Sequence, residues 1–293
     1  MKKSKKIKTP RMKACPFCKK RRSKDGGVCA TCQSVMLENH SEMIYPEDFI
    51  NKIICGDCLD VMKHIPDESI DLGVTSPPYD DLRDYNGYNF DYMATLSAIY
   101  RVLKSGGIAI WVVGDKTHKG TETGTSFKHA LHAKDIVGFN LHDTMIYEKS
   151  GMSYPDSTRY HQIFEYMFVF SKGKPKTVNL IKDRKNKWVG LTGGNKRGGL
   201  CNRKEYGARF NVWRYANGRD NSTKDRIAFK HPAIFPEGLA KDHIISWSNP
   251  GDTVLDPMCG SGTTCKSAKL LNRNFIGIDI SEEYCEIARE RLG

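Results

Sequence analysis

The chain has 293 residues, of which 39% are hydrophobic and 10% aromatic, so it can bury the core of one large domain with smaller additions. No apolar run approaches the length of a membrane span, and the lysine-rich start lacks the apolar core of a signal peptide, which predicts a cytoplasmic protein without a membrane partner. The net charge of +12 is concentrated in residues 1–24 and 172–230, a segregation typical of nucleic-acid binding.

Residues 1–42 predict a basic tail followed by a small zinc module. Two CxxC pairs lie ten residues apart, and their members are Cys15, Cys18, Cys29 and Cys32. Each pair can present two thiolates from one tight turn, and two pairs complete the tetrahedral set of a structural Zn²⁺. Unliganded cysteines are the alternative, which the spacing disfavours. For residues 1–12 alone, a solvated tail is favoured over a nucleic-acid contact.

From residue 43 onward, patterns typical of strands and helices alternate. This alternation predicts an α/β fold with a mostly parallel sheet and helices on both faces. Strands are expected at 52–55, 70–74, 108–113, 142–148, 164–170, 253–256 and 275–279, and helices at 58–64, 91–103, 126–138, 263–271 and 282–291. The strands at 142–148 and 164–170 lack a helix between them and predict an antiparallel hairpin at the sheet edge. Gly106 and Gly107 are expected to cap the helix before them.

A proline-rich loop, Ser76, Pro77, Pro78 and Tyr79, follows the strand at 70–74. Two consecutive prolines supply no N–H group and cannot continue a central strand. They therefore predict a rigid loop at the carboxyl end of the strand, with free carbonyl groups and an aromatic ring beside them. Such a loop suits the binding of an amino group while the ring stacks on the base that carries it.

A glycine-rich turn follows the strand at 253–256. Its glycines allow backbone to approach a ligand closely, and the next helix begins with unpaired N–H groups. The strand at 275–279 ends in an acid that can hold the ribose hydroxyls of a nucleoside cofactor, with helix capping as its alternative role. The predicted cofactor residues here are Asp256, Pro257, Met258, Cys259, Gly260, Gly262, Thr263 and Asp279. Cys259 is interpreted as a small packing residue and not as a nucleophile.

Residues 172–230 interrupt the alternation with seventeen basic residues against four acids. Aromatic residues lie between the basic ones, namely Trp188, Tyr206, Phe210, Trp213 and Tyr215. Basic and aromatic residues in one segment favour a nucleic-acid interface. A loop without function is the alternative.

Together these motifs resemble the DNA amino-methyltransferases that use S-adenosylmethionine, in the circularly permuted arrangement called the beta class. The resemblance covers residues 51–171 and 231–293. It implies a seven-stranded Rossmann-like methyltransferase sheet, to which this chain adds the zinc ribbon and an inserted basic recognition region. The expected divisions are 1–42 for the tail and zinc ribbon, 43–171 for the catalytic part, 172–230 for target recognition and 231–293 for the cofactor-binding part.

The resemblance also implies residue roles. Asp57 would bind the adenine of the cofactor and Phe235 would line its methionine end, with helix capping and core packing as the respective alternatives. Ser76 and the Pro77 carbonyl would accept hydrogen bonds from the target amino group, while Pro78 fixes the loop and a flipped base stacks on Tyr79. Serine at this position favours cytosine N4 over adenine N6.

The expected function is therefore methylation of an exocyclic amino group in double-stranded DNA by a bacterial or phage-encoded enzyme, with cytosine N4 favoured. Adenine N6 is the first alternative. An RNA base methyltransferase and a non-catalytic DNA-binding protein are the others. A homodimer and a cognate restriction endonuclease are left open as partners.

Overall fold

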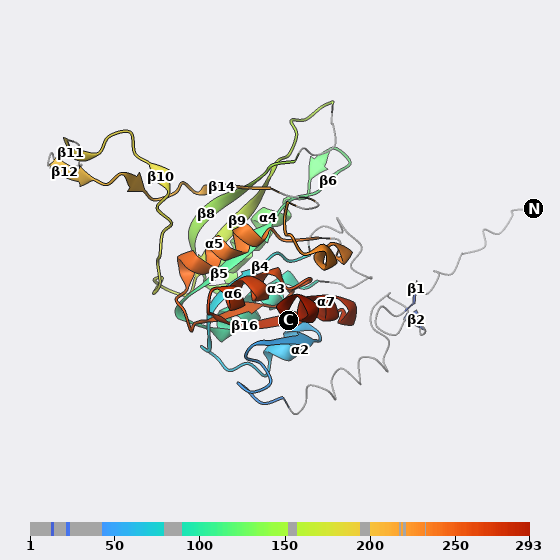
Figure 1. Cartoon of the computed structure of the whole chain (residues 1–293). Coiled ribbons are helices and arrows are strands. Elements are labelled where there is room, and N and C mark those ends of the chain that lie inside the picture. The colour runs from blue at the N-terminus through green and yellow to red at the C-terminus, as the bar shows by residue number, and fades with distance from the viewer. Residues whose placement is uncertain are drawn as a thin grey trace, which may run out of the picture.

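The computed structural model describes residues 13–14, 22–23, 43–78, 90–151, 157–193, 200–216, 218, 221–231 and 233–293. Its centre is an eight-stranded sheet (Figure 1). In spatial order the strands are β14 (Val212–Tyr215), β8 (Asn140–Lys149), β9 (Phe164–Ser171), β5 (Leu103–Val113), β4 (Ile70–Thr75), β15 (Thr253–Asp256), β16 (Asn274–Asp279) and β3 (Lys52–Cys55). Strand β9 is antiparallel to both of its neighbours, and every other pairing in this sheet is parallel.

Helices cover both faces of the sheet, as the alternation predicts. One face carries α2 (Cys58–Met62), α3 (Tyr92–Val102) and α4 (Thr125–Leu131), which continues into the π-helical turn η1 (His132–Val137). The other carries α5 (Glu237–Trp247), α6 (Thr263–Leu270) and α7 (Glu282–Leu292). Strand β5 shows why two cores form, because Trp111 packs on the first face while Ile110 and Val112 pack on the second.

Three expectations about the sheet are corrected. The sheet has eight strands and not seven, because β14 from the basic segment pairs with β8. The antiparallel pair β8 and β9 exists, but β14 covers it, so it is not the edge. Gly106 and Gly107 do not cap a helix, because α3 ends at Val102 and both glycines lie inside β5, where Gly106 has φ +81°.

Helix α5 was not expected. It begins after Pro236 and has buried residues on most of its circumference, including the polar His243 and Ser246. A helix buried in this way shows no clear separation of apolar and polar faces. The proline before it and Glu237 in its first turn are the start signals in the sequence.

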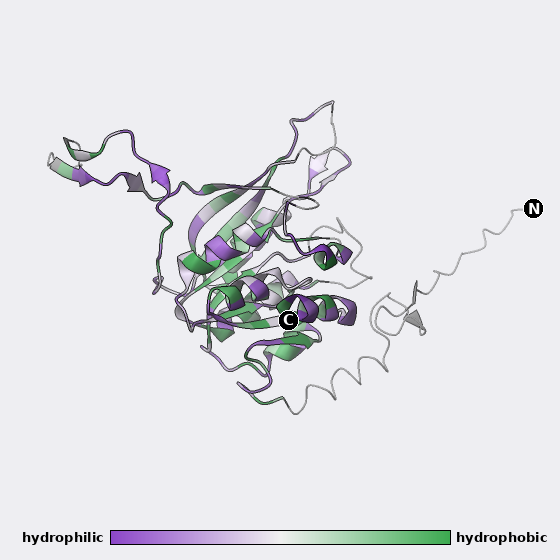
Figure 2. Cartoon of the chain, viewed as in Figure 1, coloured by the Kyte–Doolittle hydropathy of each residue, from purple (hydrophilic) through white to green (hydrophobic). Residues whose placement is uncertain are grey.

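The basic segment forms an arm that projects from the sheet (Figure 1). Two short antiparallel ladders build it, β10 (Arg184–Lys185) with β13 (Tyr206–Gly207), and β11 (Gly190–Gly193) with β12 (Leu200–Arg203). Hydrophilic and hydrophobic residues mix along the arm, whereas hydrophobic residues concentrate in the central strands (Figure 2). Trp188 and Leu191 are 70% and 74% exposed there.

The arm is fixed to the body at its root by Arg209. Its guanidinium donates to Asp183 Oδ2 at 2.8 Å and to Asp242 Oδ2 of α5 at 2.7 Å. It also lies over the ring of Trp213, which is buried in β14. Trp213 and Tyr215 are therefore packing residues, whereas Trp188, Tyr206 and Phe210 are exposed.

At the N-terminus, β1 (Lys13–Ala14) and β2 (Arg22–Ser23) form an antiparallel pair. The first CxxC pair lies between them in the sequence, but Cys15, Cys18, Cys29 and Cys32 are outside the described residues. No helix in the described ranges is both long and apolar enough to cross a membrane.

Candidate active site

The glycine turn leaves β15 and leads directly into α6. Met258 N donates to Asp256 Oδ1 at 3.2 Å, Cys259 N to Ile278 O at 2.8 Å, and Gly262 N to Cys259 O at 2.8 Å. The turn is thus tied both to itself and to β16, while Pro257 is buried within it. At Gly260 a Cβ would lie 2.8 Å from His231 Nε2, and at Gly262 it would lie 2.7 Å from Ala288 Cβ, so neither position has room for a side chain.

The first turn of α6 presents backbone donors. Gly262 precedes the helix with φ +75° and provides no side-chain cap, so the N–H groups that begin at Thr263 are not satisfied by a capping side chain. Such a helix start favours electron-rich ligand atoms. The turn can therefore receive the polar part of a small cofactor.

Asp279 ends β16 and braces the glycine turn. Its Oδ2 accepts from Gly260 N at 2.8 Å and its Oδ1 from Ser281 N at 2.9 Å. Ser281, and not Asp279, is the N-cap residue of α7, so the capping alternative does not describe its geometry. Burial raises the pKa of Asp279 to about 6.

Asp57 lies beside this acid at the end of β3, where Gly56 N donates to Asp279 O at 2.9 Å. Asp57 is the N-cap of α2, and its Oδ1 accepts from Leu59 N at 2.8 Å and from Asp60 N at 3.4 Å. Its capping role is thus present in the structure. A carboxylate has further lone pairs, so the cap leaves capacity for a ligand.

The proline loop begins at the end of β4. Ser76 and Pro78 are half-buried and Pro77 is buried, whereas Tyr79 lies outside the described residues. Just before the loop, Thr75 is 2% exposed, so its hydroxyl is held inside the protein at the end of β4. Thr264 of α6 donates to Val74 O at 3.3 Å, which ties the start of the glycine-turn helix to the strand of the proline loop.

The proline loop and the glycine turn leave neighbouring strands. Leu255 of β15 is in register with Gly73 of the parallel strand β4, so Ser76 and Asp256 leave the sheet at the same edge. From β4 the chain proceeds to β5 on one side, and from β15 it proceeds to β16 on the other. This is the topological switch point of the sheet, where ligands bind in open α/β folds. Burial raises the pKa of Asp256, which stands at this point, to about 6.

The segment before α5 closes the turn from a third side. The His231 ring packs against Gly260 and lies edge-on to Tyr284, with centroids 4.3 Å apart. Phe235 is half-buried and packs against the core of the α5, α6 and α7 face. The packing role of Phe235 is therefore present, and its ring is still partly exposed.

Three of the described cysteines lie in or beside the predicted site motifs. Cys55, Cys58 and Cys259 are free thiols, and burial raises the pKa of Cys58 to about 12. The neighbouring Cys265 thiol and burial raise the pKa of Cys259 well above its usual value, consistent with a packing residue. Within the described ranges, no group of three or more His, Cys, Asp or Glu could hold a metal ion.

Three residues at the site were not singled out from the sequence: Thr75, Thr264 and Arg291, whose guanidinium donates to Ser261 O in the glycine turn. Thr264 lies in the glycine motif, so its position gave a signal. Arg291 gave none, because its polar partners lie 28 to 68 residues away in the sequence. Only the fold brings these residues together.

Comparison with known proteins identifies the family of this chain. A family model described as DNA methylase matches residues 70–290. The orphan methyltransferase M.BamHII of Bacillus amyloliquefaciens is 61% identical over 242 residues, which cover 78% of this chain and 91% of that protein. The type II methyltransferase M.HpaI of Haemophilus parainfluenzae is 33% identical over 253 residues, covering 82% of this chain and 74% of that protein.

Solved structures share the fold. The PvuII DNA methyltransferase (cytosine-N4-specific) aligns with a TM-score of 0.61 at 21% identity, covering 82% of this chain and 86% of that one. A putative DNA modification methylase of Thermus thermophilus, complexed with S-adenosyl-L-methionine, aligns with a TM-score of 0.54 at 23% identity, covering 82% and 94%. The chain belongs to the N6/N4 DNA methylase family and is an enzyme of that family.

Proposed function

We propose that this enzyme transfers a methyl group from S-adenosylmethionine to the exocyclic amino nitrogen of a base flipped out of double-stranded DNA, with cytosine N4 as the favoured target. One observation carries the proposal: the proline loop and the glycine turn leave the adjacent parallel strands β4 and β15 at the switch point of the sheet. A donor held by the turn and an amino group held by the loop would meet there.

The residues around the glycine turn fit this donor. Gly260 and Gly262 bring backbone close, and α6 offers N–H groups without a side-chain cap. Asp279 would accept from the ribose hydroxyls, Asp57 from the adenine amino group, and Phe235 would line the methionine end. When bound, the donor supplies a sulfonium-activated methyl group. The protein's contribution is to hold it in line with the acceptor nitrogen.

At the proline loop, hydrogen-bond acceptors would activate the target nitrogen. Its lone pair is delocalised into the base, so it is a poor nucleophile while the amino group is planar. Ser76 Oγ and the Pro77 carbonyl would accept from both N–H bonds and favour a pyramidal nitrogen. These fixed dipoles also stabilise the positive charge that develops on it. The surplus proton then leaves to solvent.

A flipped base needs a stacking partner and a duplex anchor. Tyr79 would provide the first, and the exposed aromatic and basic residues of the arm would provide the second. The four N-terminal cysteines would hold a structural Zn²⁺. The basic residues of that module would add further positive charge to the surface that binds DNA.

Nucleoside analysis by mass spectrometry tests the proposal. Plasmid DNA is incubated with the enzyme and S-adenosylmethionine, with Tyr79→Ala as control, and is then digested. N4-methylcytosine with the wild type, absent with the variant, is the expected result. Detection of N6-methyladenine would support the proposed site but contradict cytosine N4 as the target. If the DNA contains no methylated base and RNA is methylated in a parallel reaction, the substrate is RNA and not DNA.

A further inference from the structure

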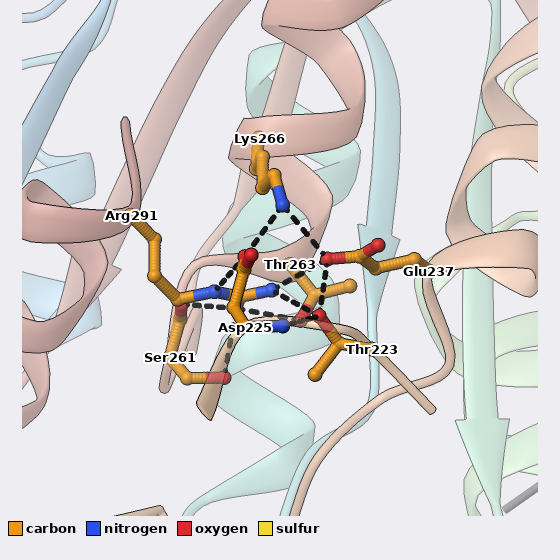
Figure 3. Close-up of polar contacts among 7 residues, drawn as sticks. All are labelled: Thr223, Asp225, Glu237, Ser261, Thr263, Lys266 and Arg291. Atoms are coloured by element: carbon orange, nitrogen blue, oxygen red, sulfur yellow. Dashed lines mark hydrogen bonds and ion pairs between the residues drawn. The ribbon is translucent and has the colours of Figure 1, made fainter. Parts of the chain in front are cut away.

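A buried arginine on α7 donates hydrogen bonds to the glycine turn. The Arg291 side chain of α7 is 0% exposed. Its Nη1 donates to Ser261 O at 2.5 Å, to Ser261 Oγ at 3.1 Å and to Thr263 Oγ1 at 3.0 Å (Figure 3). One charged group therefore binds the peptide at the tip of the turn and the first residue of α6.

Two acids hold this arginine in place. Arg291 Nε donates to Asp225 Oδ2 at 3.1 Å and Nη2 to Glu237 Oε1 at 2.8 Å. Lys266 of α6 binds the same two oxygens at 2.5 and 3.1 Å, as Figure 3 shows. A buried charge is costly unless it is paired, so the position of the guanidinium depends on these acids.

Both acids come from the part of the chain that returns from the arm. Asp225 follows β14 by ten residues and precedes the 3₁₀ turn η2 (Arg226–Lys230), which leads to His231 on Gly260. Glu237 is the first residue of α5. The same helix carries Asp242, which binds Arg209 at the arm root at 2.7 Å and Tyr215 of β14 at 2.6 Å. A continuous set of contacts thus runs from the arm root through α5 to the glycine turn.

We propose that Arg291, held by Asp225 and Glu237, is a positioning residue that sets the shape of the glycine turn and couples it to the DNA-binding arm. The inference rests on the proposed function, since it assumes that the turn binds S-adenosylmethionine and the arm binds DNA. Engagement of the arm stabilises α5 and its acids in the arrangement that fixes Arg291. DNA therefore tightens donor binding, and by thermodynamic linkage the donor tightens DNA binding by the same factor.

The test uses the full chain and its Asp225→Asn variant, which keeps the shape of the side chain and removes its charge. The Kd of S-adenosylmethionine is measured by calorimetry without DNA. The Kd of S-adenosylhomocysteine, which lacks the methyl group and stands in for the donor because it cannot react, is measured with and without unmethylated plasmid DNA. Wild type is expected to bind the donor about fivefold more tightly with DNA. Asp225→Asn is expected to weaken donor binding about tenfold and to lose the DNA effect, while its affinity for DNA alone is unchanged.

Arg289→Lys is the matched control. Arg289 lies on the same helix and pairs with Glu282, but its side chain is 45% exposed, so both affinities should stay at wild-type values. Hydrogen exchange of the amides from Gly260 to Thr264, measured without ligand, gives a second readout that does not depend on activity. These amides should exchange faster in Asp225→Asn than in wild type and Arg289→Lys.

The outcomes separate the two proposals. A wild type that binds no S-adenosylmethionine would overturn the proposed function and this inference with it. Donor binding by the wild type that is unchanged in Asp225→Asn, with unchanged exchange at the turn, would overturn the inference alone. A weakened variant whose donor affinity still responds to DNA like that of the wild type would overturn the coupling to the arm.

Discussion

Asp279 is a carboxyl group removed from water but held by two backbone N–H groups, those of Gly260 and Ser281. Burial is the larger effect, and it raises the pKa of this acid from 3.8 to about 6. The folded chain then binds a proton more tightly than the unfolded chain does. From this group, the free energy of unfolding falls as the pH rises from about 4 to about 6, and it is constant above that.

Donor binding should show the opposite pH dependence. The ribose hydroxyls would donate to Asp279, and the ionised carboxylate accepts such hydrogen bonds more strongly than the protonated form. We expect the Kd of S-adenosylmethionine to rise as the pH falls below about 6, measured by calorimetry from about pH 5 to pH 8. Asp279→Asn should bind the donor weakly and lose most of this dependence. A wild-type Kd that is constant across the range would contradict the assigned role.

Asp57 caps the N-terminus of α2 and is also proposed to bind the adenine of the donor. Two substitutions distinguish these roles. Asn can cap a helix and Ala cannot. Asp57→Ala should lower the free energy of unfolding by about 1 kcal/mol in urea titrations. Asp57→Asn should leave stability nearly unchanged and still weaken donor binding. Equal donor affinity in Asp57→Asn and wild type would restrict Asp57 to the capping role.

At the scale of elements, two tryptophans of the basic segment should differ sharply. Trp213 of β14 is buried and donates to Phe210 O at 2.9 Å, so Trp213→Ala should cost about 3–5 kcal/mol of stability. Trp188 is 70% exposed on the arm, so Trp188→Ala should change stability by less than about 0.5 kcal/mol.

The exposed ring should matter for DNA instead. Loss of one stacking side chain costs about 1–3 kcal/mol of binding, so Trp188→Ala should weaken DNA binding about 5- to 150-fold, measured by fluorescence anisotropy. Its thermal unfolding is the control for folding. Wild-type DNA affinity in Trp188→Ala would show that this part of the arm does not contact DNA.

The elements that the sequence predicted are those with local signals. Strands β3 and β15 have the expected bounds, and the other expected strands and helices of the main domain are present, shifted by a few residues at their ends. Strand β14 was missed because its four residues lie in a basic, polar segment and its pairing with β8 joins residues 66 apart. Local periodicity carries no information about such a pairing.

The same distinction holds for the site. The proline loop and the glycine turn are contiguous motifs, so their residues could be named from the sequence. The burial of the Thr75 hydroxyl depends on packing, and the Arg291 network depends on segments that are far apart in the chain. In both cases the environment of the side chain is set by residues that are close in the folded protein but far apart in the sequence, so the sequence pattern could not predict it.

At the scale of the whole molecule, the zinc module remains a prediction, because its cysteines lie outside the described residues. Cys15→Ser combined with Cys18→Ser should release zinc, measured by elemental analysis, and weaken DNA binding more than donor binding. The reason is that the donor site lies in the main domain. Equal loss of both affinities would indicate that the module stabilises the fold instead.

The projection of the arm has a consequence for how such enzymes diversify. Its two ladders, β10 with β13 and β11 with β12, pair within the arm, and Arg209 anchors its root. Substitutions within the arm can therefore accumulate without changing the packing of the central sheet, which carries the candidate active site. If the arm reads the target, as we propose, grafting the hairpin of a relative onto this chain should change the methylated sequence and leave the main domain folded.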